Sequence, residues 1–365
     1  MQIIKLSSIQ ISPNYTTHKL ASMHKPQYYS EYLELDKIIN AQHPVSFEPG
    51  HQPAHDEMLF IVIHQAYELW FKQILFELGT VLDILGKPVN DNSPELQLVV
   101  HRVQRVNTIL RVLVHQVDIL ETMPAMDFLD FRDMLRPASG FQSWQFKVIE
   151  AKLGLKFGHR HGQDYYLSQL NATDLANIKE AEQGPSLLPL LNNWLERMPF
   201  LNDKTLWKGF DATCDDSFWD AYEKKYKESL SESEQANAEG FNYVFHGASA
   251  EGAQRGLSPA ACRSALFIML YRGYPLLELP FQFLDALLEM DNQLGNWRFR
   301  HLNMVRRMIG TRVGTGGSTG AGYLQGALEK HYIFKEISQL TSFLIDRRKL
   351  PVLPEAVVEL LGYKK

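Results

Sequence analysis

The chain has 365 residues, of which 45% are hydrophobic and 22% are charged, and its formal net charge is −5. This composition is typical of a soluble globular protein and excludes wholesale disorder, collagen and coiled-coil rods. A slightly acidic chain lacks the bulk positive charge that binds nucleic acid or an anionic membrane surface, so we expect neither partner.

Cysteine content and hydrophobic runs give a first expectation about the cellular compartment. Two cysteines, Cys214 and Cys262, are too few for a disulfide framework or an all-cysteine zinc site. The first residues lack the apolar run of a signal peptide, and no stretch reaches the ~20 uncharged apolar residues that span a bilayer. The sequence therefore predicts a cytoplasmic protein with no membrane partner.

The first part of the chain predicts an N-terminal extension followed by long helices. We expect residues 1–28 to form an irregular extension and residues 29–40 to form a short helix. Between Asp56 and Leu85 apolar residues recur every three or four positions, which is the pattern of a helix with one buried face. A serine N-cap followed by proline predicts a second long helix over about 94–121.

Later segments add further helices and almost no strand pattern. Ser139 opens a capping box, so we expect a helix from about 140 to Gly154. Weaker or later signals predict helices over 173–182, 186–197, 216–230, from 259 onward, over 280–310 with Pro280 as the opening residue, and over 323–347. Because period-2 alternation is nearly absent, the sequence predicts an all-α fold. We expect one helical domain over 29–365, with long core helices and a smaller helical excursion over 155–257.

One candidate site lies on the first long helix. Phe60 and His64 are four residues apart and so share a helix face that is otherwise apolar. A neutral imidazole there could hydrogen-bond the N–H group of a buried ligand or act as a base. The alternative is a core histidine bonded to a backbone carbonyl, and spacing alone favours this alternative.

A second candidate is the segment around His301. Trp297 lies one helical turn before this histidine, and four arginines lie nearby, at positions 298, 300, 306 and 307. A lone helical histidine that faces an apolar slot is the form of an axial haem ligand, and arginines suit haem propionates. The alternative is a solvated basic face with a packed histidine.

Two further segments suggest contacts to a polar ligand. Arg132 lies shortly before a predicted helix N-terminus and would favour a carboxylate, although a structural salt bridge is the alternative. Residues 314–322 are rich in glycine but match neither a phosphate-binding loop nor a dinucleotide fingerprint. The GxSxG pattern within them needs a preceding strand, which is not predicted. The segment is therefore either a loop that closes over a small polar ligand or a plain connection.

Taken together, these segments resemble the tryptophan 2,3-dioxygenase family. The matching stretches occur in the family's order at 29–36, 55–70, 120–143 and 297–320. The resemblance implies an all-α haem enzyme, usually a homotetramer, in the kynurenine pathway of tryptophan catabolism. Such an enzyme opens the indole ring of L-tryptophan with O2 and gives N-formylkynurenine.

The resemblance also implies residues that bind the cofactor. The cofactor would be haem b, with Fe²⁺ in the active state. His301 would be its proximal iron ligand, with Trp297 and Gly314 beside it. Ser139 would lie near the haem and the bound O2, and would be a catalytic residue together with His64.

The substrate residues follow by the same resemblance. His64 matches the distal histidine that bonds the indole N–H, and Phe60 packs on the indole. Arg132 would pair with the substrate carboxylate, and Thr315 would meet the ammonium group. Tyr29 and Tyr32 would belong to an N-terminal segment that reaches the pocket, often from a neighbouring subunit.

Two alternatives stay open at this point. A related haem enzyme that inserts one oxygen atom, or that acts on a modified tryptophan or another indole, would keep nearly all of these residues. A haem sensor without turnover is the second alternative. Arg132 and Thr315 argue against the sensor, because a gas sensor has no use for groups that hold both ends of an amino acid.

Overall fold

The computed structural model describes residues 26–89, 93–161, 170–198, 201, 203–214, 216–247, 255–314 and 320–362. By its contacts the chain divides into two units, Met1–His43 and Pro44–Lys365. All regular structure in the described ranges is helical, which confirms the predicted all-α fold. The predicted extension over 1–28 and the predicted domain over 29–365 remain predictions.

The first unit contains two short helices, α1 (Tyr29–Tyr32) and α2 (Leu35–Ile39). The single helix expected over 29–40 is interrupted at Glu34, whose φ of 51° is left-handed and cannot continue an α-helix. Neither helix has a buried residue, and Tyr29 and Tyr32 are both exposed.

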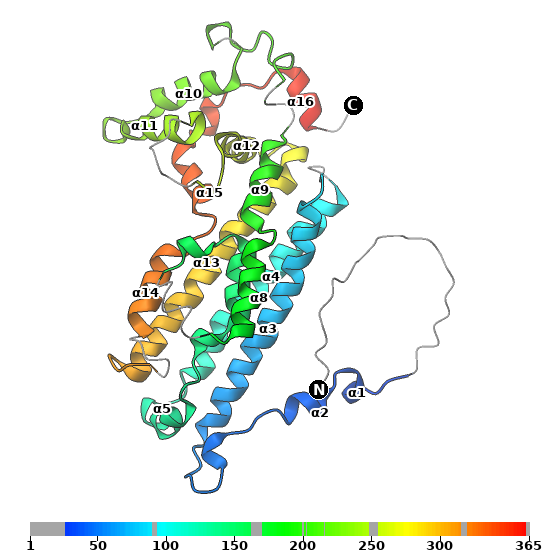
Figure 1. Cartoon of the computed structure of the whole chain (residues 1–365). Coiled ribbons are helices and arrows are strands. Elements are labelled where there is room, and N and C mark those ends of the chain that lie inside the picture. The colour runs from blue at the N-terminus through cyan, green and yellow to red at the C-terminus, as the bar shows by residue number, and fades with distance from the viewer. Residues whose placement is uncertain are drawn as a thin grey trace. The chain divides into compact units, whose positions relative to one another are not determined.

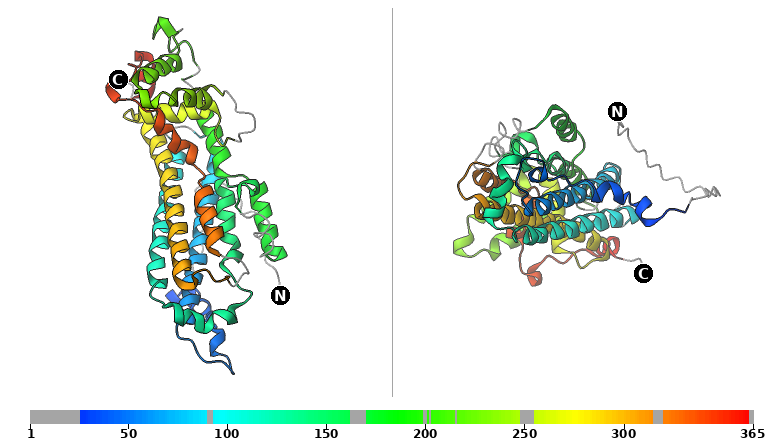
Figure 2. Two further views of the ribbon diagram at one scale, coloured as in Figure 1. Left: turned by 90° about the vertical axis from the view of Figure 1, so that its left-hand side faces the viewer. Right: turned by 90° about the horizontal axis from the view of Figure 1, so that it is seen from below.

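Three long helices form the centre of the second unit. They are α3 (Asp56–Leu85), α4 (Pro94–Leu120) and α13 (Pro275–Ile309), which run side by side (Figures 1 and 2). The predicted bounds of α3 are confirmed, and its buried residues recur at helical spacing. The predicted N-cap of α4 is also present, since the Ser93 hydroxyl accepts from the Leu96 amide at 3.2 Å.

The start of α13 differs from the prediction. Pro280 was expected to open this helix, whereas the helix begins at Pro275 and Pro280 lies inside it. Pro275 already occupies the first helical position, where a missing N–H costs nothing. Pro280 then removes one hydrogen bond in the second turn, a cost that the long buried face of α13 outweighs.

Shorter helices surround the long ones. Four of them pack against α3 or α13: α5 (Ala125–Arg132), α6 (Trp144–Leu153), α9 (Leu187–Glu196) and α14 (Gly320–Lys330). A fifth, α8 (Ala172–Gln183), packs against α6. The remaining helices of this unit are α10 (Phe218–Ser229), α11 (Asn237–Phe241), α12 (Pro259–Leu270), α15 (Lys335–Gln339) and α16 (Glu355–Leu361). Figures 1 and 2 show that α10, α11 and α12 gather at one end of the long helices. Aromatic packing holds this group together, as in the stacked rings of Trp219 and Phe245 at 5.7 Å.

Two other predicted helices begin or end elsewhere. The Ser139 capping box is present, but it caps a 3₁₀ turn over Gly140–Gln142, and α6 begins at Trp144. The helix expected over 323–347 is instead divided into α14 and α15. It breaks because the Asp291 carboxylate accepts the amides of Ile333 and Phe334, at 3.2 and 2.5 Å.

No helix in the described part of the chain combines the length and the apolar character that crossing a bilayer requires.

Candidate active site

A cavity of about 220 Å³ opens within the second unit, between α3, α5, α6, α13 and α14. Several of the residues singled out from the sequence line it: Phe60, His64, Arg132, Ser139, Trp297, His301 and Gly314. The other three are not placed at the cavity. Tyr29 and Tyr32 belong to the first unit, and Thr315 lies outside the described residues.

His301 lies on a stripe of α13 that faces the cavity. Trp297, Met304, Val305 and Met308 share this stripe at intervals of three or four residues. The His301 Nδ1 atom is buried and has no hydrogen-bond partner among the described residues. Burial, and to a smaller extent the imidazole of His64, lowers the pKa of His301 to about 4. The ring is therefore neutral at physiological pH, which is the state that ligates a metal.

His64 lies on α3 and faces the same cavity. Its Nδ1 atom is 2.6 Å from the backbone oxygen of Phe60. A carbonyl can only accept, so Nδ1 carries the proton and Nε2 keeps a free lone pair. Burial lowers the pKa of His64, although the Phe60 hydrogen bond and the charge of Glu68 oppose this effect. The sequence allowed either a core histidine bonded to a backbone carbonyl or a histidine that binds a ligand. His64 satisfies both descriptions, because its Nδ1 atom bonds the Phe60 carbonyl while its Nε2 atom offers an acceptor to the cavity.

Aromatic rings fix the walls beside both histidines. The Phe60 ring lies 4.1 Å from that of His64 and packs on Phe128 at 5.8 Å. On the other helix, Trp297 packs on His301 at 5.2 Å and on Phe146 at 4.7 Å. These contacts hold flat apolar surfaces next to two neutral imidazoles, and such walls suit a planar apolar ligand.

Arg132 places a positive charge in this apolar cavity. It is buried at the C-terminal end of α5, and its guanidinium donates to the backbone oxygen of Val313. Its ion-pair partner is the carboxylate of Asp133, at 3.7 Å, which is exposed to solvent. A buried guanidinium whose counter-ion is exposed favours a ligand carboxylate. The contact to Val313 shows that Arg132 also has a structural role.

Ser139 contributes a hydroxyl at the edge of the cavity. Its Oγ accepts from the Phe141 amide at 3.4 Å, while its own amide donates to the Gln142 side chain at 3.2 Å. Within the described part of the chain, the hydroxyl proton has no acceptor. It is available to an oxygen atom of a ligand.

The four arginines near His301 do not act as one group. Arg298 is buried and donates to Glu150 at 2.7 Å, whereas Arg300 pairs with Asp118 at 2.7 Å. Arg306 donates to Gln325 at 3.0 Å. The cavity is also lined by three ionisable residues that the sequence did not indicate: Lys147, Glu150 and His331. No local signal marks them, because their partners come from distant parts of the chain.

The lining residues fit a haem group. His301 supplies a buried neutral imidazole whose Nδ1 atom has no partner among the described residues, and His64 supplies a second neutral imidazole on another helix that lines the cavity. The apolar stripe of α13 provides the surface that a flat macrocycle needs.

Comparison with known proteins agrees with this geometry. Residues 14–344 match the family described as tryptophan 2,3-dioxygenase.

The chain belongs to the tryptophan 2,3-dioxygenase family.

Individual members of the tryptophan 2,3-dioxygenase family match nearly end to end. The proteins of that name from Bdellovibrio bacteriovorus and Alteromonas mediterranea are 41% and 42% identical, over 93% of this chain and 98% of their own lengths. The one from Dictyostelium discoideum is 38% identical over 94% of this chain and 90% of its own length. The match to the tryptophan 2,3-dioxygenase family also includes residues 155–275, where none of the motifs that carried the resemblance lies.

Proposed function

We propose that the protein is a haem-dependent dioxygenase that opens the indole ring of L-tryptophan with O2 to give N-formylkynurenine. One observation carries the proposal. A chain of the tryptophan 2,3-dioxygenase family places His64 and His301 on facing helices of one cavity, with a buried arginine beside them. Membership of this family makes the protein an oxidoreductase of tryptophan catabolism.

His301 would hold the haem iron, and Trp297 and Gly314 would lie beside the cofactor. When bound, the haem supplies the iron at which O2 is activated. The neutral state of His301 supports this role, since only an unprotonated ring nitrogen can ligate. We propose haem b, with Fe²⁺ in the active state.

The other cavity residues would bind and orient the substrate. His64 Nε2 would accept the indole N–H, because its Nδ1 proton is already committed to Phe60. The Phe60 ring would pack on the indole, and Arg132 would hold the carboxylate. Ser139 would donate its hydroxyl proton to an oxygen atom near the reacting carbons.

The remaining assignments rest on the family resemblance alone. Thr315 would meet the substrate ammonium, and Tyr29 and Tyr32 would contribute from an N-terminal segment, often that of a neighbouring subunit. We further propose a homotetramer that works in the cytoplasm. Sedimentation of the haem-loaded protein as a monomer would contradict the assembly.

The protonation state of His64 predicts the acid side of the pH profile. Protonation removes the Nε2 lone pair, so kcat/KM for L-tryptophan should fall when His64 becomes charged. Because burial lowers the pKa of His64 below its ordinary 6.5, the enzyme should keep more than half of its maximal kcat/KM at pH 6.5, and the half-maximal value should lie in more acidic buffer. Steady-state kinetics between pH 5 and 8 provide the measurement. A decline that is half complete at or above pH 6.5 would show that a different group controls substrate binding.

Product mass after turnover with ¹⁸O2 tests the reaction itself. The haem-loaded, reduced protein should convert L-tryptophan to a product that carries two ¹⁸O atoms. One labelled oxygen would mean a monooxygenase on the same scaffold. No product despite a normal haem spectrum would indicate another indole substrate, or a haem sensor.

A further inference from the structure

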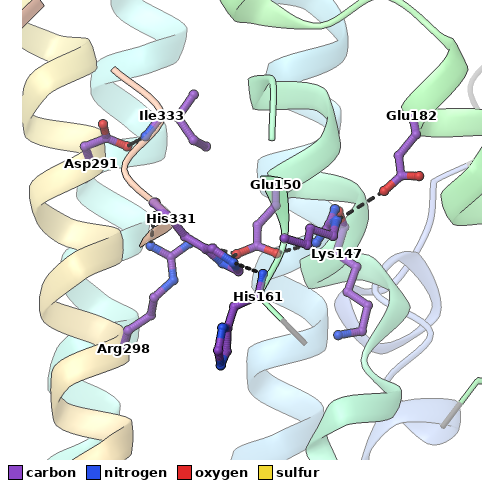
Figure 3. Close-up of polar contacts among 9 residues, drawn as sticks. Lys147, Glu150, His161, Glu182, Asp291, Arg298, His331 and Ile333 are labelled. Carbon is purple, nitrogen blue, oxygen red and sulfur yellow. Dashed lines mark hydrogen bonds and ion pairs between the residues drawn. The ribbon is translucent and has the colours of Figure 1, made fainter. Parts of the chain in front are cut away.

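A buried group of polar and charged side chains holds the C-terminal end of α14 (Figure 3). We name it the α14 anchor, and it consists of Glu150, Asp291, Arg298 and His331, which Figure 3 labels, together with Arg160, which donates to Glu150. Each of these five residues is at most 5% exposed. Buried charges are costly unless they are paired, so such a group holds its partners in one arrangement.

Glu150 is the centre of the α14 anchor. Its Oε1 atom accepts from Arg298 at 2.7 Å and from His331 Nδ1 at 3.2 Å, and its Oε2 atom accepts from Arg160 at 2.7 Å. Burial by itself would raise the pKa of Glu150. The His331 hydrogen bond and the two guanidinium charges outweigh burial and hold that pKa well below its ordinary value.

His331 connects Glu150 to the end of α14, and its hydrogen bonds fix the imidazole in one tautomer. The His161 amide donates to the Nε2 atom of His331 at 3.1 Å, so Nε2 is an acceptor. Nδ1 therefore carries the ring proton and donates a hydrogen bond to Glu150. The backbone oxygen of His331 accepts from Arg298 at 3.1 Å. The residue that directly follows α14 is therefore held through both its ring and its backbone.

Asp291 adds a second point of attachment from α13. It lies seven residues before Arg298, which is two helical turns, so both side chains share one face of α13. Its carboxylate accepts the amides of Ile333 and Phe334. The segment 331–334 is thus held by α6 through Glu150 and by α13 through two residues.

This attachment has a consequence for the cavity. Three residues of α14, Tyr323, Leu324 and Ala327, line the cavity wall. From position 331 to position 323 the helix extends ~12 Å, at 1.5 Å per residue. A tilt of only about 5° at the attached end would move Tyr323 by about 1 Å, and a displacement of that size can cost about a hundredfold in rate or binding.

We propose that Glu150 is a positioning residue for substrate binding: through His331 and Arg298 it sets the orientation of α14 and so the cavity wall that Tyr323, Leu324 and Ala327 form. This inference rests on the proposed function for the identity of the substrate. Glu150 borders the cavity, but His331, Arg298 and Arg160 engage both of its oxygens, so it acts through them.

Two variants of the full-length, haem-loaded protein test this role. Glu150→Gln removes the charge, and His331→Phe fills the imidazole space while it removes both hydrogen bonds of the ring. Each should raise KM for L-tryptophan roughly 10- to 100-fold, because a displacement of about 1 Å in the cavity wall can cost about a hundredfold. Each should leave kcat within about threefold of wild type, because no group that touches the reacting atoms is lost. Hydrogen exchange by mass spectrometry should become faster in peptides that cover 320–334.

Glu77→Gln is the matched control. Glu77 is another buried carboxylate, 1% exposed on α3, and it pairs with Arg102 and Arg105 at 3.2 and 2.9 Å. This residue does not line the cavity. Its variant should lose thermal stability without a change in KM or in exchange over 320–334.

The double variant Glu150→Gln/His331→Phe should raise KM no more than the worse single variant, because both remove the same link. Unchanged exchange over 320–334 in both single variants, or a KM that rises equally in the Glu77 control, would overturn the proposal. If Glu150→Gln does not fold, the KM of His331→Phe and its hydrogen exchange over 320–334 test the proposal by themselves. Should the wild type not turn over L-tryptophan, the proposed function fails, whereas hydrogen exchange still shows whether Glu150 orients α14.

Discussion

Replacing His301 with alanine should leave the purified protein without a Soret band. The His301 ring is the buried neutral imidazole on the apolar stripe of α13, and its Nδ1 atom has no partner within the described residues. Since one axial ligand holds the iron in the proposed site, its loss removes stable haem binding. Haem titration followed by absorbance, together with iron content per chain, provides the measurement.

His64→Ala is the informative control for this experiment. Both imidazoles face the cavity, so either one is a candidate ligand on chemistry alone. His64 already commits its Nδ1 atom to Phe60 and is proposed to meet substrate, so its variant should bind haem at wild-type stoichiometry. If His64→Ala loses the Soret band and His301→Ala keeps it, the roles of the two histidines are reversed.

Replacing Arg132 with alanine should raise KM for L-tryptophan steeply. Truncating the buried partner of a charged group typically costs about 2–5 kcal/mol, which corresponds to roughly 30-fold or more in binding. The effect should depend on the substrate carboxylate. The wild type should therefore prefer L-tryptophan strongly over tryptamine, which lacks that group, and the variant should lose most of this preference. Steady-state KM values for both compounds provide the measurement.

Arg136→Ala separates this effect from a general loss of positive charge. Arg136 lies four residues further on and its side chain is 53% exposed, with Asp133 3.4 Å away. Its removal should leave KM for L-tryptophan within about twofold, because an exposed ion pair contributes little. An Arg132→Ala enzyme with unchanged KM, or one that disfavours tryptamine as strongly as wild type, would show that Arg132 does not bind the carboxylate. Its hydrogen bond to Val313 would then be its whole role.

Two of the three long helices, α3 and α4, could be predicted from the sequence. The apolar period between Asp56 and Leu85 and the Ser93 cap depend on residues only a few positions apart, and both are found as predicted. The pairs Phe60 with His64 and Trp297 with His301 follow from the same local spacing. Assigning their chemistry needed the family resemblance as well, and the roles of Thr315, Tyr29 and Tyr32 remain predictions.

Local signals failed where a distant side chain competes with the helix. One helix was predicted over 323–347, but the Asp291 carboxylate accepts the amides of Ile333 and Phe334, so α14 ends at Lys330 and α15 begins at Lys335. The prediction that Pro280 opens a helix was wrong because tertiary packing again outweighs a local signal. The buried face of α13 compensates for the one backbone hydrogen bond that Pro280 removes.

The sequence by itself determined that this protein is helical, where α3 and α4 run, and which histidines share a helix face with apolar residues. Only the tertiary structure decided that His64 and His301 share one cavity, and that Glu150 joins Arg160, Arg298 and His331. Those three partners lie 10, 148 and 181 residues away along the chain. Periodicity and capping act over a few residues, whereas a buried charge is stable only when the folded chain brings its partners to it.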